Sequence, residues 1–146
     1  MKVCWFGLYK SDYSRNKILI DGLRAHGVEV VECKISYIIP FKYFKLIKAL
    51  RTLKKDYDIL YCAFPINYNV IIAKLFQSKP IVIDAFFPLY DAYVEDRKVV
   101  SRFAPKALIY QWLDYLNLRL ANLVIADRQQ HKEDWRTVYS RRPIKV

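Results

Sequence analysis

The residue types best suited to chemistry gather in one segment, residues 84–98, which follows the fourth apolar run of the chain. The segment holds four acidic residues, one arginine and several aromatic rings. This combination suits a sugar ligand, because carboxylates accept hydrogen bonds from hydroxyl groups and aromatic rings pack against C–H faces. We therefore expect ligand contacts from Asp84, Tyr90, Asp91 and Arg97. The alternative is a loop packed by its own aromatic rings, with acids that are solvated or cap the next helix.

A second candidate site lies at the start of the first expected helix, where Asp12, Ser14 and Arg15 follow one another closely. The free N–H groups and the dipole of a helix N-terminus favour an anion. Arg15 adds a cation that suits a charge-assisted hydrogen bond to phosphate. Simple N-capping of the helix by Asp12 or Ser14 is the alternative.

These candidates depend on elements that bring them together. Short Val/Ile/Leu-rich runs alternate with helical stretches, which predicts a parallel sheet covered by helices on both faces. We expect a single Rossmann-like, doubly wound α/β domain of about six strands, in which ligands bind outside the carboxyl ends of the strands. The expected strands are residues 3–6, 28–33, 58–64, 80–84, 123–126 and 144–146; the expected helices are residues 14–26, 41–55, 67–77, 105–121 and 127–139.

Composition limits the class of protein. A chain of 146 residues suits one domain, and a hydrophobic content of 54% argues against disorder. The longest apolar runs are far shorter than the roughly 18 to 20 residues that span a bilayer. The first strand follows Met1 almost directly, so we expect no signal peptide and a cytoplasmic protein.

Several common site types are not indicated by the sequence. The chain has only three glycines and lacks the glycine-rich phosphate-binding motifs and a G-x-S-x-G nucleophile elbow. Its three cysteines, Cys4, Cys33 and Cys62, are expected to be buried thiols. With only two histidines besides them, a metal site is not expected.

The net charge of +11 favours an anionic partner. Basic residues recur every three positions from Lys42 to Lys54, and each three-residue step falls about 60° short of a full turn. We therefore expect them to drift around the helix, leaving it either solvated or in contact with an anionic membrane surface. Nucleic acid is disfavoured because no exposed aromatic platform or recognition motif is evident. A non-catalytic basic module that binds anionic lipid or nucleic acid is the alternative function.

Three parts of the sequence resemble a known family. KVCWFG (residues 2–7), DYSRN (residues 12–16) and GLRAHGVEV (residues 22–30) look like the opening of GT-B glycosyltransferases of the group 1, family 4 type. ANLVIAD (residues 121–127) resembles their ADLVIAD strand, with Asn122 in place of the usual aspartate and His131 following as in many members. Residues 84–98 are similar to a subgroup with DAF, LYD and DRK in this segment.

The resemblance, which covers nearly the whole chain, implies an amino-terminal, acceptor-binding domain of a retaining, metal-independent transferase. In that family a second Rossmann-like domain holds most of the nucleotide-sugar donor. We therefore expect residues 1–146 to bind no cofactor alone and to need a missing or separate donor-binding domain. The expected acceptor is a sugar on a lipid carrier or a polysaccharide, met at the cytoplasmic membrane face.

The resemblance also distributes roles among the candidate residues. It implies acceptor contacts from the segment 84–98 and donor phosphates near the start of the first helix. Asp127 is expected either in the cleft or as a helix cap, since Gln130 completes a capping box with it. The residues assigned in this way are Asp84, Tyr90, Asp91 and Arg97 for the acceptor; Gly7, Asp12 and Arg15 for the donor phosphates; and Asp127 and His131 for the cleft.

Overall fold

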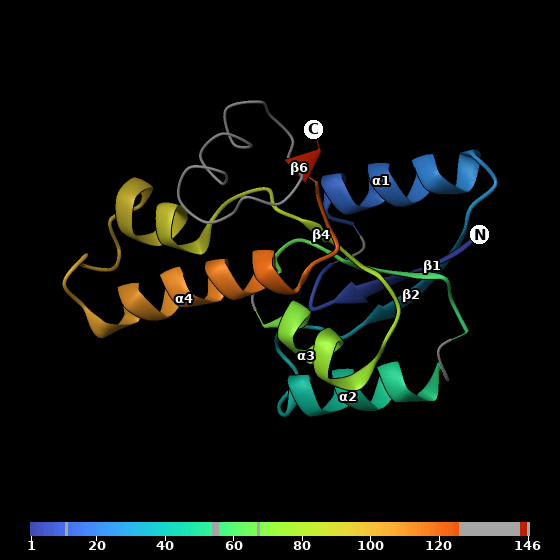
Figure 1. Ribbon diagram of the computed structural model, residues 1–146, viewed down its shortest axis with the longest axis horizontal. Helices are drawn as coiled ribbons and strands as arrows, with labels where there is room; N and C mark the ends of the chain where they lie inside the picture. Colours follow the sequence, from blue (N-terminus) through green and yellow to red (C-terminus); the bar gives the residue numbers. More distant parts are fainter. Residues whose placement is uncertain (11, 54–55, 67, 126–143, 146) are drawn as a thin grey trace.

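The computed structural model describes residues 1–10, 12–53, 56–66, 68–125 and 144–145. Its centre is an all-parallel sheet in the order β2-β1-β3-β4-β5-β6 (Figure 1). Five strands have three residues or more, and the edge strand β6 has two. The strands are β1 (Lys2–Gly7), β2 (Glu29–Lys34), β3 (Ile59–Cys62), β4 (Ile81–Asp84), β5 (Leu123–Ile125) and β6 (Ile144–Lys145). The predicted α/β class and parallel sheet are confirmed.

Helices lie on both faces of the sheet. The connection from β1 to β2 carries α1 on one face, whereas the connections that lead to β3, β4 and β5 run the opposite way and carry α2, α3 and α4 on the other face (Figure 1). Right-handed crossovers place helices on opposite faces of a sheet when the connections run in opposite directions, which explains this arrangement. The helices are α1 (Ser14–Ala25), α2 (Lys42–Thr52), α3 (Asn69–Phe76), the π-helix η1 (Asp91–Asp96) and α4 (Pro105–Leu120).

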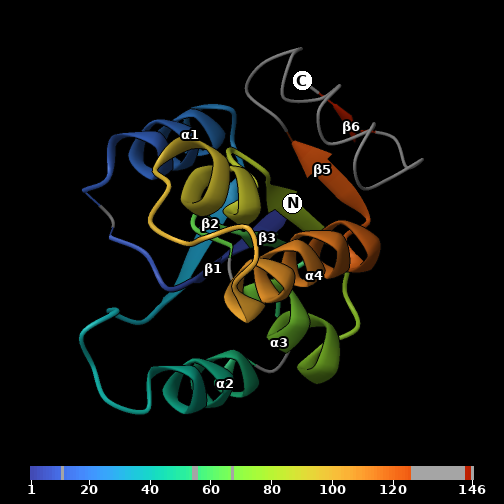
Figure 2. The ribbon, with the colours of Figure 1, turned by 90° about the vertical axis from the view of Figure 1, so that its left-hand side faces the viewer.

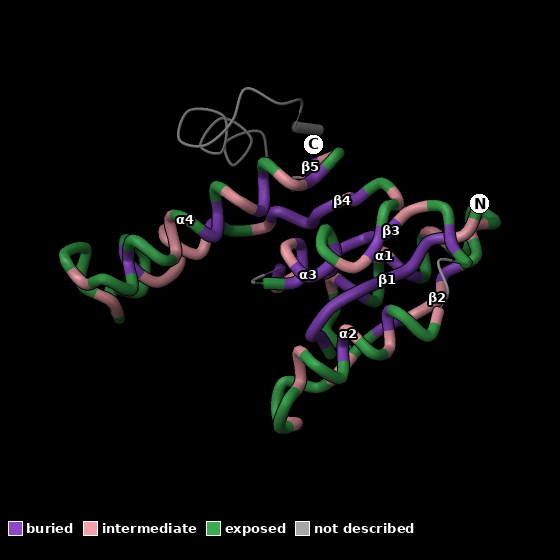
Figure 3. Tube along the Cα trace, turned by 60° about the horizontal axis from the view of Figure 1, so that its bottom comes forward, coloured by how far each residue is buried: buried purple, intermediate pink, exposed green. Residues whose placement is uncertain are grey.

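Strand β1 shows why the apolar runs are continuous. Successive side chains of a strand point to opposite faces, so Val3 and Trp5 pack in the cluster beside α1, while Cys4 and Phe6 pack beside α2 and α3. All four are buried, and Figure 3 shows the central strands buried along their length. Both faces of β1 are therefore core, which requires apolar residues at every position.

The strand order reverses between β1 and β3, because β1 pairs with β2 on one side and with β3 on the other. Such a switch point is where doubly wound sheets place their ligands, outside the carboxyl ends of the strands. Figure 2 views the molecule from this edge, with α1, η1, α4 and the amino-terminal end of α2 arranged around it. The fold thus brings the loops after β1, β2, β3 and β4 to one side.

Two details of the helices differ from the sequence predictions. The N-cap position of α1 is held by Tyr13, whose side chain makes no capping hydrogen bond, and not by Asp12 or Ser14, which the sequence offered as alternative caps. In α4, helical spacing groups Ile109 and Trp112 with Leu113, Leu116 and Leu120 on one apolar side, which predicts core positions, but Ile109 and Trp112 are 50% and 65% exposed. The reason is that the amino-terminal half of α4 extends beyond the sheet (Figures 1 and 3). Among the described residues, no helix combines the length and apolarity needed to cross a bilayer.

Candidate functional site

Asp84, the last residue of β4, forms a two-pronged ion pair with Arg15 from the first turn of α1. Arg15 Nε donates to Oδ2 of Asp84 over 2.7 Å, and Arg15 Nη2 donates to Oδ1 over 2.6 Å. The Asp84 side chain is fully buried, whereas that of Arg15 is 20% exposed. Each carboxylate oxygen thus accepts a charge-assisted hydrogen bond. The pair ties α1 to the end of β4 and fixes the position of the guanidinium.

The loop after β4 is fixed at a second point by Asp114, a buried residue of α4. Its two carboxylate oxygens accept hydrogen bonds from the backbone N–H groups of Leu89 and Tyr90, each over 2.9 Å. Burial raises the pKa of Asp114 to about 7, the nearby charge of Asp91 acts in the same direction, and the two N–H donors act against it. The backbone that leads into η1 is therefore held by a carboxyl group whose protonation changes near neutral pH.

The loop after β3 is held by two buried asparagines from opposite faces of the sheet. Asn16 of α1 donates from Nδ2 to the carbonyl oxygen of Phe64 over 3.3 Å, and Asn69 of α3 donates from Nδ2 to that of Pro65 over 3.1 Å. Both asparagine side chains are fully buried. They hold the backbone of the loop after β3 at the point where the strand order reverses.

Gly7, at the end of β1, lies against one of these asparagines. Its φ angle is +148°, which L-residues with side chains rarely adopt, and a Cβ placed there would lie 2.7 Å from Nδ2 of Asn69. The close approach explains why glycine is needed at this position. What Gly7 faces is the Asn69 side chain.

An aromatic groove opens at the carboxyl edge between the loops after β2, β3 and β4. Its volume is about 380 Å³. The guanidinium carbon of Arg97 lies 5.6 Å from the ring centre of Tyr93, a cation–π distance, and among the described residues Arg97 has no ion-pair partner. We call this pocket the edge groove; it is lined by Tyr37, Phe64, Pro65, Phe87, Leu89, Ala92, Tyr93 and Arg97.

A second pocket, of about 340 Å³, lies over the first turns of α1, with Arg15 and Phe86 in its lining. The guanidinium carbon of Arg15 lies 4.6 Å from the ring centre of Phe86. Because Asp84 already neutralises this arginine, the pocket attracts an anion less than an unpaired arginine would. Of the two pockets, the edge groove therefore attracts an anion more strongly, because Arg97 has no ion-pair partner among the described residues.

The structure brings only some of the predicted site residues together. Asp84 and Arg15, assigned from the sequence to different ligand groups, bond to each other. Arg97 lines the edge groove, while Tyr90 and Asp91 stand where the loop enters η1 and are not among its lining residues. Asp12 is exposed in the turn before α1. Gly7 lies against the side chain of Asn69, and Asp127 and His131 lie outside the described residues.

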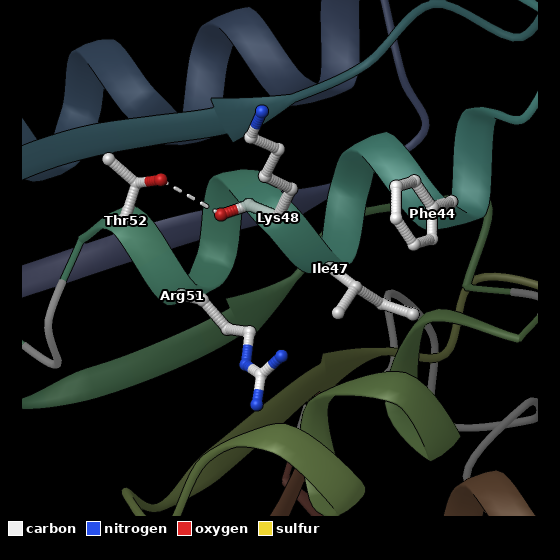
Figure 4. A pocket seen from close by; sticks show the side chains of 5 residues that line it. All are labelled: Phe44, Ile47, Lys48, Arg51 and Thr52. Carbon is white, nitrogen blue, oxygen red and sulfur yellow. Dashed lines mark hydrogen bonds between the residues drawn. The ribbon is translucent and has the colours of Figure 1, made fainter.

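The basic residues of α2 recur every three positions along the helix. With Lys42, the first residue of the helix, the basic positions span about 180° of it, and Lys45, Lys48 and Arg51 span about 120°. All three are exposed, on the side opposite the buried Leu46 and Leu50. Figure 4 shows Lys48 and Arg51 with Phe44, Ile47 and Thr52 around a shallow pocket of about 290 Å³. The drift predicted around the helix is thus seen over about half a turn, and Lys54, the fifth predicted position, lies outside the described residues.

Metal ligation and thiol chemistry find little support in the part of the chain that the structure describes. No group of three or more His, Cys, Asp or Glu residues there is arranged to hold a metal ion. The three cysteines are buried and unpaired by disulfides, as predicted, and burial raises the pKa of Cys62. These thiols act as core residues.

Sequence reasoning missed the buried polar residues that shape the edge. Asn16, Asn69 and Asp114 stand on the core faces of their helices and are fully buried. The available signal was a polar residue at a core-facing helical position, since such a group is retained only when hydrogen bonds compensate its burial. Comparison with protein-family models, with curated proteins and with solved structures found no match to this chain.

Proposed function

We propose that this chain is the acceptor-binding half of a retaining, nucleotide-sugar-dependent glycosyltransferase, and that the acceptor sugar binds in the edge groove. The observation that carries the proposal is the groove itself. It lies at the carboxyl edge of a doubly wound sheet, and four aromatic rings and one arginine line it. Rings of this kind pack on the C–H faces of a sugar, and a guanidinium binds hydroxyl or phosphate oxygens.

In this proposal the residues of the edge bind the acceptor sugar and hold it in one orientation. Tyr93 and Phe87 supply aromatic surface to the groove for contact with the sugar, and Arg97 supplies its cation. Asp84 and Asp114 are positioning residues, because their carboxylates hold Arg15 and the loop backbone. Holding the acceptor in one orientation lowers the entropic part of the barrier to transfer.

The other half of the chemistry requires a donor-binding domain. Transfer from a nucleotide-sugar needs contacts that stabilise the leaving nucleotide in the transition state. The pocket over α1 has Arg15 in its lining and is our candidate for contact with the donor, although the pairing of Arg15 with Asp84 means that most of the charge that binds the donor phosphates must come from the donor-binding domain. A separate or additional domain that holds the nucleotide would complete the cleft.

The test is retention of the purified chain on a glycan array, followed by affinity measurements on the glycans that bind. We expect Tyr93→Ala and Arg97→Ala each to weaken binding by about tenfold or more, which corresponds to about 1.4 kcal/mol. The matched control is the second cation–π pair at the same spacing, Tyr115 and Arg119 of α4, whose guanidinium carbon lies 6.0 Å from the ring centre.

The two pairs of variants distinguish a sugar site in the edge groove from a general effect of removing a cation–π pair. Binding lost in the Tyr93 and Arg97 variants but kept in Tyr115→Ala and Arg119→Ala supports the edge groove as the sugar site. Equal losses in both pairs, or the absence of any bound glycan from a folded protein, would overturn the proposal.

A further inference from the structure

Large apolar side chains are exposed just before and at the start of α2. Ile38 is 87% exposed, Phe41 83% and Phe44 71%. They fall within seven residues and come from the loop after β2 and the first turn of the helix. We call this surface, made of Ile38, Phe41 and Phe44, the α2 tip.

The backbone presents the tip to the outside. Phe41 has a φ angle of +56°, a left-handed conformation that is unfavourable for a residue with a bulky side chain. It precedes α2, whose opposite side is anchored in the core by Leu46 and Leu50. The helix therefore cannot turn Phe44 inward without exposing these two residues.

The charge around the tip has one sign. From Lys34 to Lys55 the sequence contains seven Lys or Arg residues and no Asp or Glu. Among the described residues, none of the ion pairs involves Lys42, Lys45, Lys48 or Arg51. Exposed apolar side chains beside unpaired cations fit a surface that is anionic outside and apolar beneath, which describes a bilayer that contains acidic lipids.

We propose that the α2 tip docks this protein on an anionic membrane surface, with Phe41 and Phe44 entering the headgroup region and Lys45 and Lys48 contacting acidic headgroups. A nucleic acid would match the cations but would leave Ile38 and Phe41 without an apolar partner. The combination of both features on one surface is what selects a lipid partner.

Docking at this surface bears on the edge groove. Tyr37 lines both the edge groove and the pocket of about 470 Å³ formed by residues 37 and 39–44. The groove therefore opens beside the tip, at the level of the headgroups of a docked membrane. This geometry favours a lipid-linked acceptor over a polysaccharide, a choice that rests on the proposed function, whereas the docking itself does not.

The test is co-sedimentation of the purified chain with vesicles of phosphatidylcholine alone or mixed with phosphatidylglycerol, at low and high salt. We expect binding only to the mixed vesicles, and less of it at high salt because salt screens the charges. Ile38→Ser with Phe41→Asn should reduce binding by about tenfold or more, as should Lys45→Glu with Lys48→Glu. Asparagine is chosen at position 41 because it tolerates the left-handed backbone.

Matched controls use exposed residues elsewhere in the molecule. Leu108→Ser with Trp112→Ser removes apolar surface from α4, where the two side chains are 62% and 65% exposed. Lys17→Glu with Lys106→Glu makes the same change in net charge at exposed positions outside the tip. Both control variants should bind the mixed vesicles as the unchanged protein does.

Three results would overturn the docking proposal: no binding to mixed vesicles at low salt, equal binding to neutral vesicles, or equal losses in the control variants. Thermal melting of each variant establishes that it is folded before it is scored. Ile38, Phe41 and Lys45 are not among the residues that line the edge groove, so the array and the vesicles test the proposed function and the docking separately.

Discussion

The loops after β4 and after β2 meet at the same edge of the sheet but are built in opposite ways. The loop after β4 is fixed by buried carboxylates, with Asp84 paired to Arg15 and Asp114 bonded to two backbone N–H groups. The loop after β2 exposes Ile38 and Phe41, and its local hydrogen bonds are long, such as the 3.5 Å bond from Ile38 N to Ser36 Oγ.

The contrast indicates two different tasks. Buried, hydrogen-bonded charges cost free energy when a partner is lost, so they hold one arrangement of the chain strongly. Exposed apolar side chains contribute little to the isolated fold and gain free energy only when something covers them. The loop after β4 is thus suited to form a fixed wall of the edge groove, and the loop after β2 is suited to meet a partner surface.

The largest expected effect comes from breaking the ion pair at the fixed loop. Arg15→Met leaves the Asp84 carboxylate buried without its main partner, and we expect the free energy of unfolding to fall by about 3–5 kcal/mol. Denaturation in urea measures this loss. Lowering the pH should restore part of it, because an isolated buried carboxyl group takes up a proton readily.

A surface pair provides the control for this experiment. Arg24 Nη2 lies 3.5 Å from Oε1 of Glu32, and the Arg24 side chain is 48% exposed. Arg24→Met should cost less than about 1 kcal/mol, since exposed ion pairs contribute little. If the Arg15 and Arg24 variants lost equal stability, the loop after β4 would not be fixed in the way described.

A smaller effect is expected from pH acting on Asp114. Its pKa is about 7 in the folded protein and 3.8 for an unperturbed carboxyl group. Between these values the folded state binds more protons than the unfolded state, so the free energy of unfolding falls as the pH rises from about 4 to about 7. We expect this contribution to be about 2–4 kcal/mol.

Asp114→Asn isolates that contribution, because the amide resembles the protonated acid and does not titrate. The difference in unfolding free energy between the original chain and the variant, followed across this pH range, should change in favour of the variant as the pH rises. A constant difference would mean that Asp114 does not titrate in this range and that its carboxylate is stable in the core.

The fold was more predictable from the sequence than the site was. Apolar runs such as residues 3–6 determine buried strands through their composition alone, so the parallel sheet followed from them. The bond between Arg15 and Asp84 spans 69 positions and depends on strand order, which local patterns do not encode. The two residues were therefore both selected as chemically important but were assigned to separate ligands.

The exposed surfaces illustrate the same limit. In α4, helical spacing predicted a core position for Trp112, yet how far a helix extends past its sheet is set by the lengths of neighbouring elements. In α2 the spacing of the lysines was evident, and Lys45 and Lys48 lie about 60° apart around the helix, but how many basic positions belong to the helix depends on its ends at Lys42 and Thr52. Local periodicity describes a helix correctly only between its true ends.

The smallest expected effect concerns the loop after β2 and has the opposite sign. Phe41 is held at a φ angle of +56° while its side chain is 83% exposed, so its replacement by asparagine removes backbone strain and little packing. We expect Phe41→Asn to raise the free energy of unfolding by about 0.5–1 kcal/mol, measured in urea. A loss of stability would show that Phe41 packs against the fold, and the loop after β2 would then resemble the loop after β4. A gain in stability that accompanies weaker vesicle binding would mean that this strained, exposed phenylalanine serves a contact outside the chain.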